Sequence, residues 1–183
     1  MKTLSLLVTS LLLGGTALFA GDKHMEAQAS GDLSASEVKF VMKAAEAGKT
    51  EAALGELAKT GGDRADVKDF GKMMADDHGA ANTKLAAIAE KNKVTLPEPG
   101  KKEEESMAKL SKLKGAEFDA AYLDEMVTAH EKAVKLFKTA QGTVKNEELK
   151  AFVDNTLPTL EKHLEKVKEL NTAKAKESAK TQS

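Results

Sequence analysis

Apolar residues recur every three to four positions through four long stretches of this 183-residue chain, and this periodicity constrains the fold more than any other feature. The spacing places apolar side chains on one face of an α-helix, at about 100° per residue. We therefore predict four amphipathic helices, over residues 34–59, 63–92, 117–140 and 146–170. Nothing alternates as a half-buried strand does, so we expect an all-α protein.

Capping residues support the first two helices. Ser34 with Glu37 three residues later matches a capping box, in which each side chain bonds a backbone N–H of the other. Gly61 and Gly62 are expected to end the first helix, and Asp63 is expected to cap the second.

Proline and glycine set the later boundaries. Pro97 and Pro99 predict a rigid extended connection over residues 94–100, followed by a short helical lead-in that Gly115 separates from the third helix. Pro158 is expected to kink or split the fourth helix, because it lacks the N–H that the helix needs. Helices joined in this way form an up-down four-helix bundle by default.

A glycine and an asparagine mark the turn between the third and fourth predicted helices. Gly142 is expected to end the third helix, and Asn146 is expected to cap the fourth. With the kinked fourth helix and the lead-in to the third, these signals complete the predicted bundle.

The two ends of the chain differ from the helical part. Residues 1–20 combine Lys2, an apolar run and a small residue at Ala20, which is the pattern of a bacterial signal peptide. We expect a periplasmic or secreted protein with no stable membrane span after cleavage, and an uncleaved anchor is the competing interpretation. Residues 21–33 predict a flexible leader, residues 34–170 the folded domain, and residues 171–183 a disordered tail rich in lysine and alanine.

Composition excludes several kinds of function. The chain has no cysteine, which removes disulfides, thiol catalysis and thiolate metal ligands. Its 28 basic and 29 acidic residues give a net charge of −1, so no nucleic-acid surface is indicated. The composition is compatible with a protein or envelope partner and indicates no oligomeric state.

Each predicted helix carries one ionisable side chain within its apolar face. These side chains are Glu51, His78, His130 and His163, and Asp77 lies at the edge of the second face. A buried charge is destabilising unless it is paired or bound to a metal. The pattern predicts a centre for Zn, Fe, Cu, Mn or Ni, with Asp77 as a fifth ligand or as a hydrogen-bond acceptor for an imidazole.

A polar core network is the alternative interpretation of the same residues. In that network Glu51 and Asp77 pair with the histidines and fix the packing without an ion. One geometric argument supports it, because His163 is expected to lie farther from its turn than His130, by about 6–10 Å along the helix axis. His24, the fourth histidine, falls in the polar leader and is expected to be incidental.

Enzyme motifs do not add a third interpretation. The sequence contains no Glu-x-x-His, which a di-iron carboxylate bundle uses on two helices. It also contains no Gly-x-Ser-x-Gly nucleophile turn and no phosphate-binding loop. The sequence therefore indicates no reaction.

Several ordered segments resemble a bacterial family of exported proteins. The segments are Ala44-Ala45-Glu46-Ala47-Gly48 with Glu51, Val67-Lys68-Asp69-Phe70 with Met73-Met74 and Asp77-His78, Phe118-Asp119 with Tyr122, Met126 and His130, and Thr156-Leu157-Pro158 with Leu160 and His163. Over residues 36–170 they are similar to the domain-of-unknown-function family 4142. The resemblance implies export and a ferritin-like four-helix fold, without an established reaction. The family commonly has Asp before the third-helix histidine, where this chain has Ala129.

Two classes of function follow from these observations. The first is an exported metal-binding bundle with a stress or metal-handling role, in which the five core residues supply the ligands. The second is a non-catalytic structural or interaction protein of the periplasm or envelope, in which the same residues form a polar network.

Overall fold

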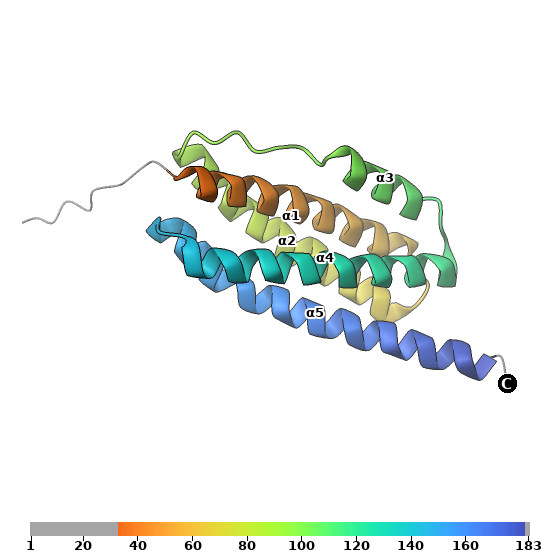
Figure 1. Cartoon of the computed structure of the whole chain (residues 1–183). Helices are drawn as coiled ribbons and strands as arrows, with labels where there is room; N and C mark the ends of the chain where they lie inside the picture. Colours follow the sequence, from red (N-terminus) through yellow and green to blue (C-terminus); the bar gives the residue numbers. More distant parts are fainter. Residues whose placement is uncertain (1–32, 182–183) are drawn as a thin grey trace, which may run out of the picture.

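The computed structural model describes residues 33–181, and within them the side chains of residues 33–101 and 103–173. This part of the chain forms five α-helices and no strand, which confirms the all-α prediction (Figure 1). The helices are α1 (Ala35–Gly61), α2 (Ala65–Lys91), α3 (Lys101–Leu110), α4 (Gly115–Thr143) and α5 (Glu147–Thr181). The predicted signal peptide 1–20 and all but the last residue of the leader 21–33 lie outside the described residues.

Local capping explains where α1 and α5 begin. Ser34 and Glu37 form the predicted capping box, with the Ser34 N–H donating to the Glu37 carboxylate over 2.8 Å. Asn146 caps α5 by accepting a hydrogen bond from the Leu149 N–H over 3.0 Å. The predicted Asp63 cap of α2 is wrong, because Arg64 holds that position and makes no side-chain capping bond there.

Helix α5 is longer than the sequence predicted. It runs without division through Pro158, so the predicted split is wrong. Pro158 is exposed and Asp154, whose carbonyl loses its N–H partner, is partly exposed, so this carbonyl is open to solvation and the helix can continue. The helix also continues to Thr181 rather than ending near Leu170, because residues 171–181 contain no glycine or proline to stop it. Helix α4 likewise passes Gly142 and ends at Thr143.

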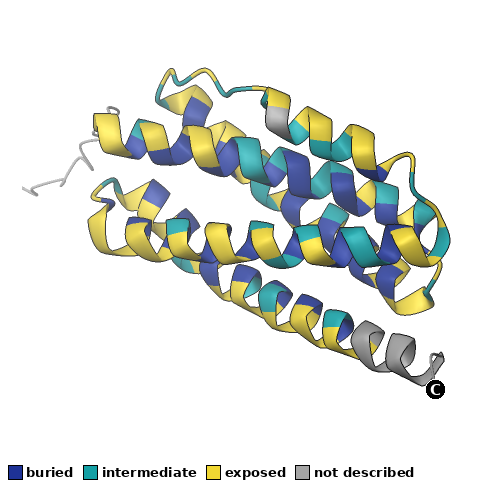
Figure 2. Ribbon diagram, turned by 45° about the vertical axis from the view of Figure 1, so that its right-hand side comes forward, coloured by how far each residue is buried: buried dark blue, intermediate teal, exposed yellow. Residues whose placement is uncertain are grey.

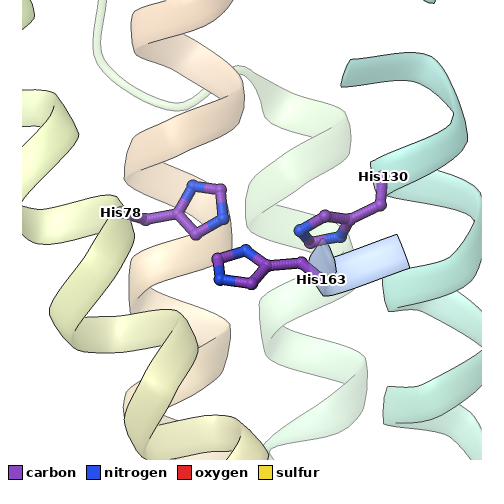
Figure 3. A group of neighbouring side chains, drawn as sticks. All are labelled: His78, His130 and His163. Carbon is purple, nitrogen blue, oxygen red and sulfur yellow. The ribbon is translucent and has the colours of Figure 1, made fainter. Parts of the chain in front are cut away.

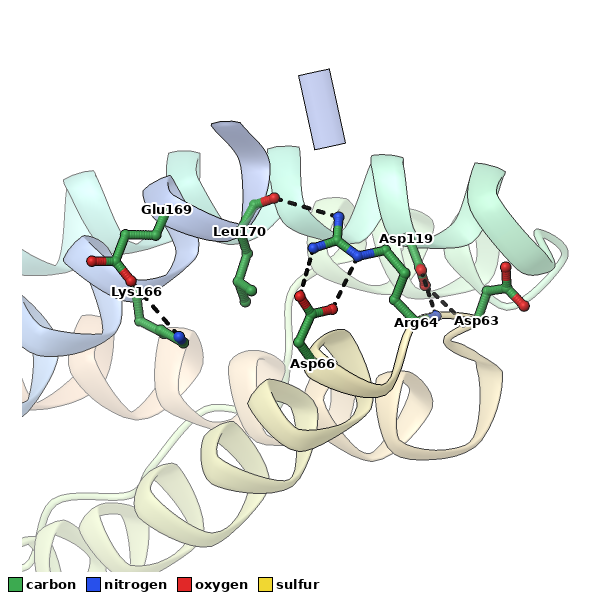
Figure 4. Close-up of polar contacts among 7 residues, drawn as sticks. All are labelled: Asp63, Arg64, Asp66, Asp119, Lys166, Glu169 and Leu170. Atoms are coloured by element: carbon green, nitrogen blue, oxygen red, sulfur yellow. Dashed lines mark hydrogen bonds and ion pairs between the residues drawn. The ribbon is translucent and has the colours of Figure 1, made fainter. Parts of the chain in front are cut away.

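Two buried carboxylates join the helical hairpins at opposite ends of the bundle. Glu37, at the start of α1, accepts hydrogen bonds from the N–H groups of Lys145 and Asn146 in the α4–α5 turn, each over 2.8 Å. At the other end, Asp119 near the start of α4 accepts hydrogen bonds from the N–H groups of Asp63 and Arg64 in the α1–α2 turn, each over 2.9 Å (Figure 4).

These contacts fix the directions of the helices and correct the predicted up-down order. The start of α4 lies beside the start of α2, and the end of α2 lies beside the start of α5, where Lys91 pairs with Glu148. Helices α2 and α4 therefore run in the same direction, although they are consecutive long helices. A long connection, consisting of residues 92–100 and α3, crosses the length of the bundle between them (Figure 1). Lys49 holds this connection to α1 through the carbonyl of Pro97 and the carboxylate of Glu98.

The long helices bury their apolar faces in two separate blocks. Helix α1 packs on α2 and α4, and α5 packs on the same two helices from the opposite corner. One apolar block fills the end of the bundle near Phe40 and Phe152, and the other fills the end near Phe70 and Phe118. Figure 2 shows buried positions along the inward faces of the four long helices.

Between the two apolar blocks lies a buried polar layer. Its members are Glu51, His78, His130 and His163. Among residues 33–181, no helix is both long enough and apolar enough to cross a membrane.

Candidate metal centre

Three histidines from three helices meet in the polar layer. His78 of α2, His130 of α4 and His163 of α5 are each no more than 5% exposed. One nitrogen from each ring lies within 4.8 Å of the other two, and the ring centroids are 5.4–5.5 Å apart. Figure 3 shows the rings turned so that one nitrogen of each faces the space between them. The sequence prediction that these three side chains share one interior is confirmed.

In each ring, the nitrogen that faces away from the other two histidines, here called the outward nitrogen, lies next to a hydrogen-bond acceptor. Nδ1 of His78 lies 3.3 Å from Oε2 of Glu51, and Nδ1 of His130 lies 2.9 Å from the carbonyl oxygen of Met126. Nε2 of His163 lies 2.9 Å from Oδ2 of Asp77. A carbonyl or an ionised carboxylate only accepts, so the contacts of His130 with Met126 and of His163 with Asp77 place the ring hydrogen on the outward nitrogen, and the contact of His78 does so when Glu51 is ionised.

The nitrogens that face the space between the three rings, here called the inward nitrogens, have no hydrogen-bond partner among the described residues. Nε2 of His78, Nε2 of His130 and Nδ1 of His163 are buried and form no hydrogen bond with any described residue. A buried polar atom left in this state costs about 1–3 kcal/mol. Three lone pairs that converge while their outward nitrogens are held by acceptors form the arrangement that histidine ligands adopt around a metal ion.

Burial keeps the three imidazoles in the form that binds metals. For His78, burial and the neighbouring rings of His130 and His163 hold the pKa well below its ordinary value. Burial lowers the pKa of His130 to about 4, in spite of the hydrogen bond to Met126. Burial also lowers the pKa of His163, and Asp77 limits that fall. The rings are therefore neutral near pH 7, as coordination requires.

Glu51 is the buried carboxylate of the layer. It lies on α1 and is 3% exposed, and burial raises its pKa to about 8. Its Oε2 atom faces His78, while its Oε1 atom lies 3.8 Å from Nδ1 of His130. No described residue forms a hydrogen bond with Oε1. The structure thus places Glu51 against the outward nitrogen of His78 and near that of His130, where an ionised carboxylate would orient the His78 ring and offset the charge of a cation.

Two glycines set the spacing between Glu51 and His78. A Cβ atom on Gly55 of α1 would lie 2.7 Å from the carbonyl oxygen of Gly71 on α2. A Cβ atom on Gly71 would lie 2.6 Å from the side chain of Ala58. The backbones of α1 and α2 therefore approach within a distance that only glycine permits. This approach lies one turn from Glu51 and about two turns from His78, so it holds the two side chains at contact distance.

Asp77 contacts the centre from outside. Its side chain is 45% exposed, and its carboxylate accepts the hydrogen bond from His163 rather than from the adjacent His78. Of the two roles predicted for Asp77, the structure displays the hydrogen-bond acceptor. Asp77 therefore contacts the ring on α5 and not the ring of its neighbour His78, because successive residues of a helix point about 100° apart around its axis.

The predicted difference in height between His130 and His163 does not separate them. His130 lies 13 residues before the end of α4, and His163 lies 16 residues after the start of α5. The difference of three residues corresponds to about 4.5 Å of helix rise. This is smaller than the expected 6–10 Å, because α4 continues past Gly142 and the turn is short. The length of an imidazole side chain spans the remaining offset.

The sequence prediction missed one acceptor in this layer. The carbonyl of Met126 holds His130, and this contact joins residues four positions apart on one helix. A backbone carbonyl leaves no trace in residue identity, although the spacing of four residues makes it a natural acceptor for a helical histidine.

The fold and the site define a class of protein, namely a helical bundle with a buried three-histidine centre that suits a transition-metal ion. The chain belongs to the family described as a domain of unknown function (DUF4142), whose model matches residues 22–170. This match confirms the resemblance seen in the sequence. No curated protein and no solved structure matches the chain.

Proposed function

We propose that this protein binds one divalent transition-metal ion through His78, His130 and His163. The observation that carries the proposal is the convergence of three inward nitrogens that form no hydrogen bond with any described residue, each in a ring whose other nitrogen lies against an acceptor. Neutral imidazoles suit Zn²⁺, Cu²⁺, Ni²⁺ and Fe²⁺, whereas oxygen ligands suit Mn²⁺. A bound ion would supply positive charge that stabilises the ionised form of Glu51 and so keeps the outward hydrogens in place.

The small space beside His78 favours holding an ion over binding a large substrate at the histidines. The cavity that adjoins Glu51 and His78 has a volume of about 30 Å³. That volume accommodates one or two water molecules and no larger ligand. We therefore propose a metal-handling role in which the bundle sequesters or carries the ion, and a role in stress follows where free metal is harmful.

The finer classification of the fold belongs to the same proposal. One long connection between two antiparallel hairpins is the arrangement of ferritin-like bundles. The connection from α2 to α4 has that form, and this supports a ferritin-like four-helix core with α3 as part of the crossover. The ligand set differs from the di-iron pattern, since three of the four polar residues in the layer are histidines.

Export is also proposed, from the sequence pattern of residues 1–20. An ion would then be bound outside the cytoplasm, in the periplasm or beyond. Sequencing the N-terminus of protein recovered from cell fractions tests this directly, and an intact Met1 on the recovered protein would overturn cleavage.

Titration of metal-free protein with Zn²⁺, Cu²⁺, Ni²⁺ and Fe²⁺ tests the proposed centre. We expect one ion per chain in calorimetry, and a loss of affinity of more than about 100-fold in the His78→Ala variant. His24→Ala provides the matched control, because it removes the chain's fourth histidine and should leave affinity unchanged. Nitrogen-15 shifts of the imidazoles should change most at Nε2 of His78 and His130 and at Nδ1 of His163. Absence of binding by every ion would leave the polar network as the better interpretation.

A further inference from the structure

A pocket under α3 leads from the surface to Glu51. It has a volume of about 230 Å³ and lies where α3 crosses α1 and α4. Three carboxylates line it, from Glu51, Glu103 and Glu125, against the single ammonium group of Lys132. Glu103 and Glu125 are partly exposed and Glu51 is buried, so carboxyl groups extend from the opening of the pocket to its floor.

Glu51 connects this pocket to the histidines. The cavity of about 30 Å³ is lined by both Glu51 and His78, so Glu51 lines this cavity as well as the pocket under α3. Within the described part of the chain, Oε1 of Glu51 is a buried oxygen without a hydrogen-bond partner, although Oε2 of the same group faces His78. The carboxylate therefore has one oxygen on the ring and one available to a ligand.

A groove between α2 and α5 is an alternative route to the histidines, but it ends at a carboxylate that already accepts a hydrogen bond. It has a volume of about 550 Å³, lies between α2 and α5, and is lined by Asp77. The Oδ2 atom of Asp77 already accepts the hydrogen bond from Nε2 of His163. This groove therefore reaches the outward nitrogen of a ring, which carries the hydrogen, and not an unpartnered acceptor.

The roof of the pocket is lightly attached to the bundle. Of the side chains described in α3, only Leu110 is buried, and Met107 is partly buried against the core. A further cavity separates Met107 and Ser111 from α1 on the other side of α3. Since few apolar contacts hold this helix, a small outward displacement of α3 requires little loss of buried surface.

We propose that a hydrated divalent cation reaches the three histidines through the pocket under α3, with Glu103 and Glu125 drawing it in and Oε1 of Glu51 as its first buried ligand. This inference rests on the proposed metal centre and adds the route by which the centre is loaded. Carboxylates at the opening raise the local concentration of cations, and the effect weakens as salt screens it.

Stopped-flow uptake of Co²⁺ by the metal-free full chain tests the route, because the visible absorption of cobalt changes when nitrogen ligands bind. Ser106→Trp places a large side chain in the pocket, and Asn155→Trp places the same side chain in the groove between α2 and α5. We expect uptake at least tenfold slower in Ser106→Trp and unchanged in Asn155→Trp, with one ion per chain at equilibrium in both.

A charge variant tests the same route without blocking it. The double substitution Glu103→Gln, Glu125→Gln should slow uptake by about threefold to tenfold at low salt and flatten its salt dependence. The double substitution Glu104→Gln, Glu105→Gln removes two carboxylates from exposed positions of α3 that do not line the pocket. It should leave the rate within about twofold of the unmodified chain.

The outcomes separate the route from the centre. Full occupancy with unchanged uptake in Ser106→Trp and in the Glu103, Glu125 variant would overturn the route and leave the centre intact. Slow uptake in Asn155→Trp alone would assign loading to the groove at Asp77 and overturn the route under α3. Failure of the unmodified chain to bind any ion would overturn the centre and the route together.

Discussion

The ends of the bundle and its middle both bury carboxylates, but only the carboxylates at the ends have hydrogen-bond partners for both of their oxygens. At the ends, Glu37 and Asp119 each accept hydrogen bonds from two successive N–H groups in a turn of the other hairpin. In the middle, Oε1 of Glu51 has no hydrogen-bond partner among the described residues, and the same is true of one nitrogen on each of three histidines.

This difference separates structural polar groups from groups that suit a ligand. The carboxylates at the ends are explained by the fold alone, because they satisfy turn N–H groups that would otherwise be buried without partners. The atoms in the middle gain nothing from the fold and lower its stability as long as they stay unpartnered. Stability at the ends should therefore be independent of metal, whereas stability in the middle should depend on it.

The largest expected effect is stabilisation by an ion. At a free Zn²⁺ concentration about 1,000 times the dissociation constant, the free energy of unfolding should rise by about 4 kcal/mol. His130→Leu should lose this gain while folding at least as stably as the metal-free parent, because leucine fills the site without an unpartnered nitrogen. Urea denaturation with and without chelator measures both quantities. Equal stabilisation of parent and variant by Zn²⁺ would show that the ion binds elsewhere.

The next effect is the loss of a carboxylate from one end. Asp119→Ala removes the acceptor of two backbone N–H groups, so the free energy of unfolding should fall by about 3 kcal/mol. Zinc affinity should stay within a factor of two, since Asp119 lies in the layer of the turns and not in that of the histidines. Denaturation and calorimetry on the same preparation compare the two. A large loss of zinc affinity in a folded Asp119→Ala protein would contradict the separation of end and middle.

Unfolding in acid should show how much Glu37, at the other end of the bundle, contributes to stability. Burial raises the pKa of Glu37, but hydrogen bonds from Asn146, Ser34 and Lys145 outweigh burial and lower the pKa from 4.5 to about 2. A carboxyl group with a lower pKa in the folded state stabilises the protein above its unfolded pKa. That contribution is complete above about pH 4.5 and disappears as the pH falls towards 2.

Glu37→Gln tests that contribution. The variant should be less stable by about 2 kcal/mol at neutral pH and should lose much of the decline in stability between pH 4.5 and 2. Unfolding free energies of parent and variant, measured across this range without metal, give the comparison. Parallel curves for the two proteins would mean that Glu37 does not carry the acid-dependent stability.

The smallest expected effect concerns Asp77. Asp77→Asn weakens the acceptor that orients His163, so zinc affinity should fall by about tenfold with one ion still bound per chain. Because the side chain is 45% exposed, the stability of the metal-free protein should change little. Calorimetry measures the affinity, and Asp76→Asn supplies a neighbouring surface carboxylate as control. Complete loss of the ion in Asp77→Asn would indicate that Asp77 binds the metal directly.

The sequence predicts the helices and the polar layer well because both depend on periodicity. The inward positions of His78, His130 and His163 follow from counting 100° per residue, and the capping roles of Ser34 and Asn146 follow from residue type. The end of α5 could not be predicted in this way, since lysine and alanine serve equally well in a helix and in a frayed tail.

The direction of α4 and the acceptors of the buried groups required the structure. A connection of moderate length with two prolines is compatible with a turn to a neighbouring corner or with a crossing to the opposite one. The residue pattern identifies Glu37 only as a capping residue of its own helix, whereas its Oε1 atom also accepts a hydrogen bond from the N–H group of Lys145, 108 residues away. In such contacts a side-chain carboxylate accepts from backbone N–H groups, whose positions residue identities do not mark.

The crossover between α2 and α4 divides the chain into two helical hairpins, and the three histidines are distributed unequally between them. A backbone cut within residues 92–100 would leave His78 on one hairpin and His130 and His163 on the other. Rejoining would then be a bimolecular reaction, and an ion would act as its third component by bridging the fragments. We expect the two halves, expressed separately, to behave as a split sensor whose reassembly reports the concentration of the ion.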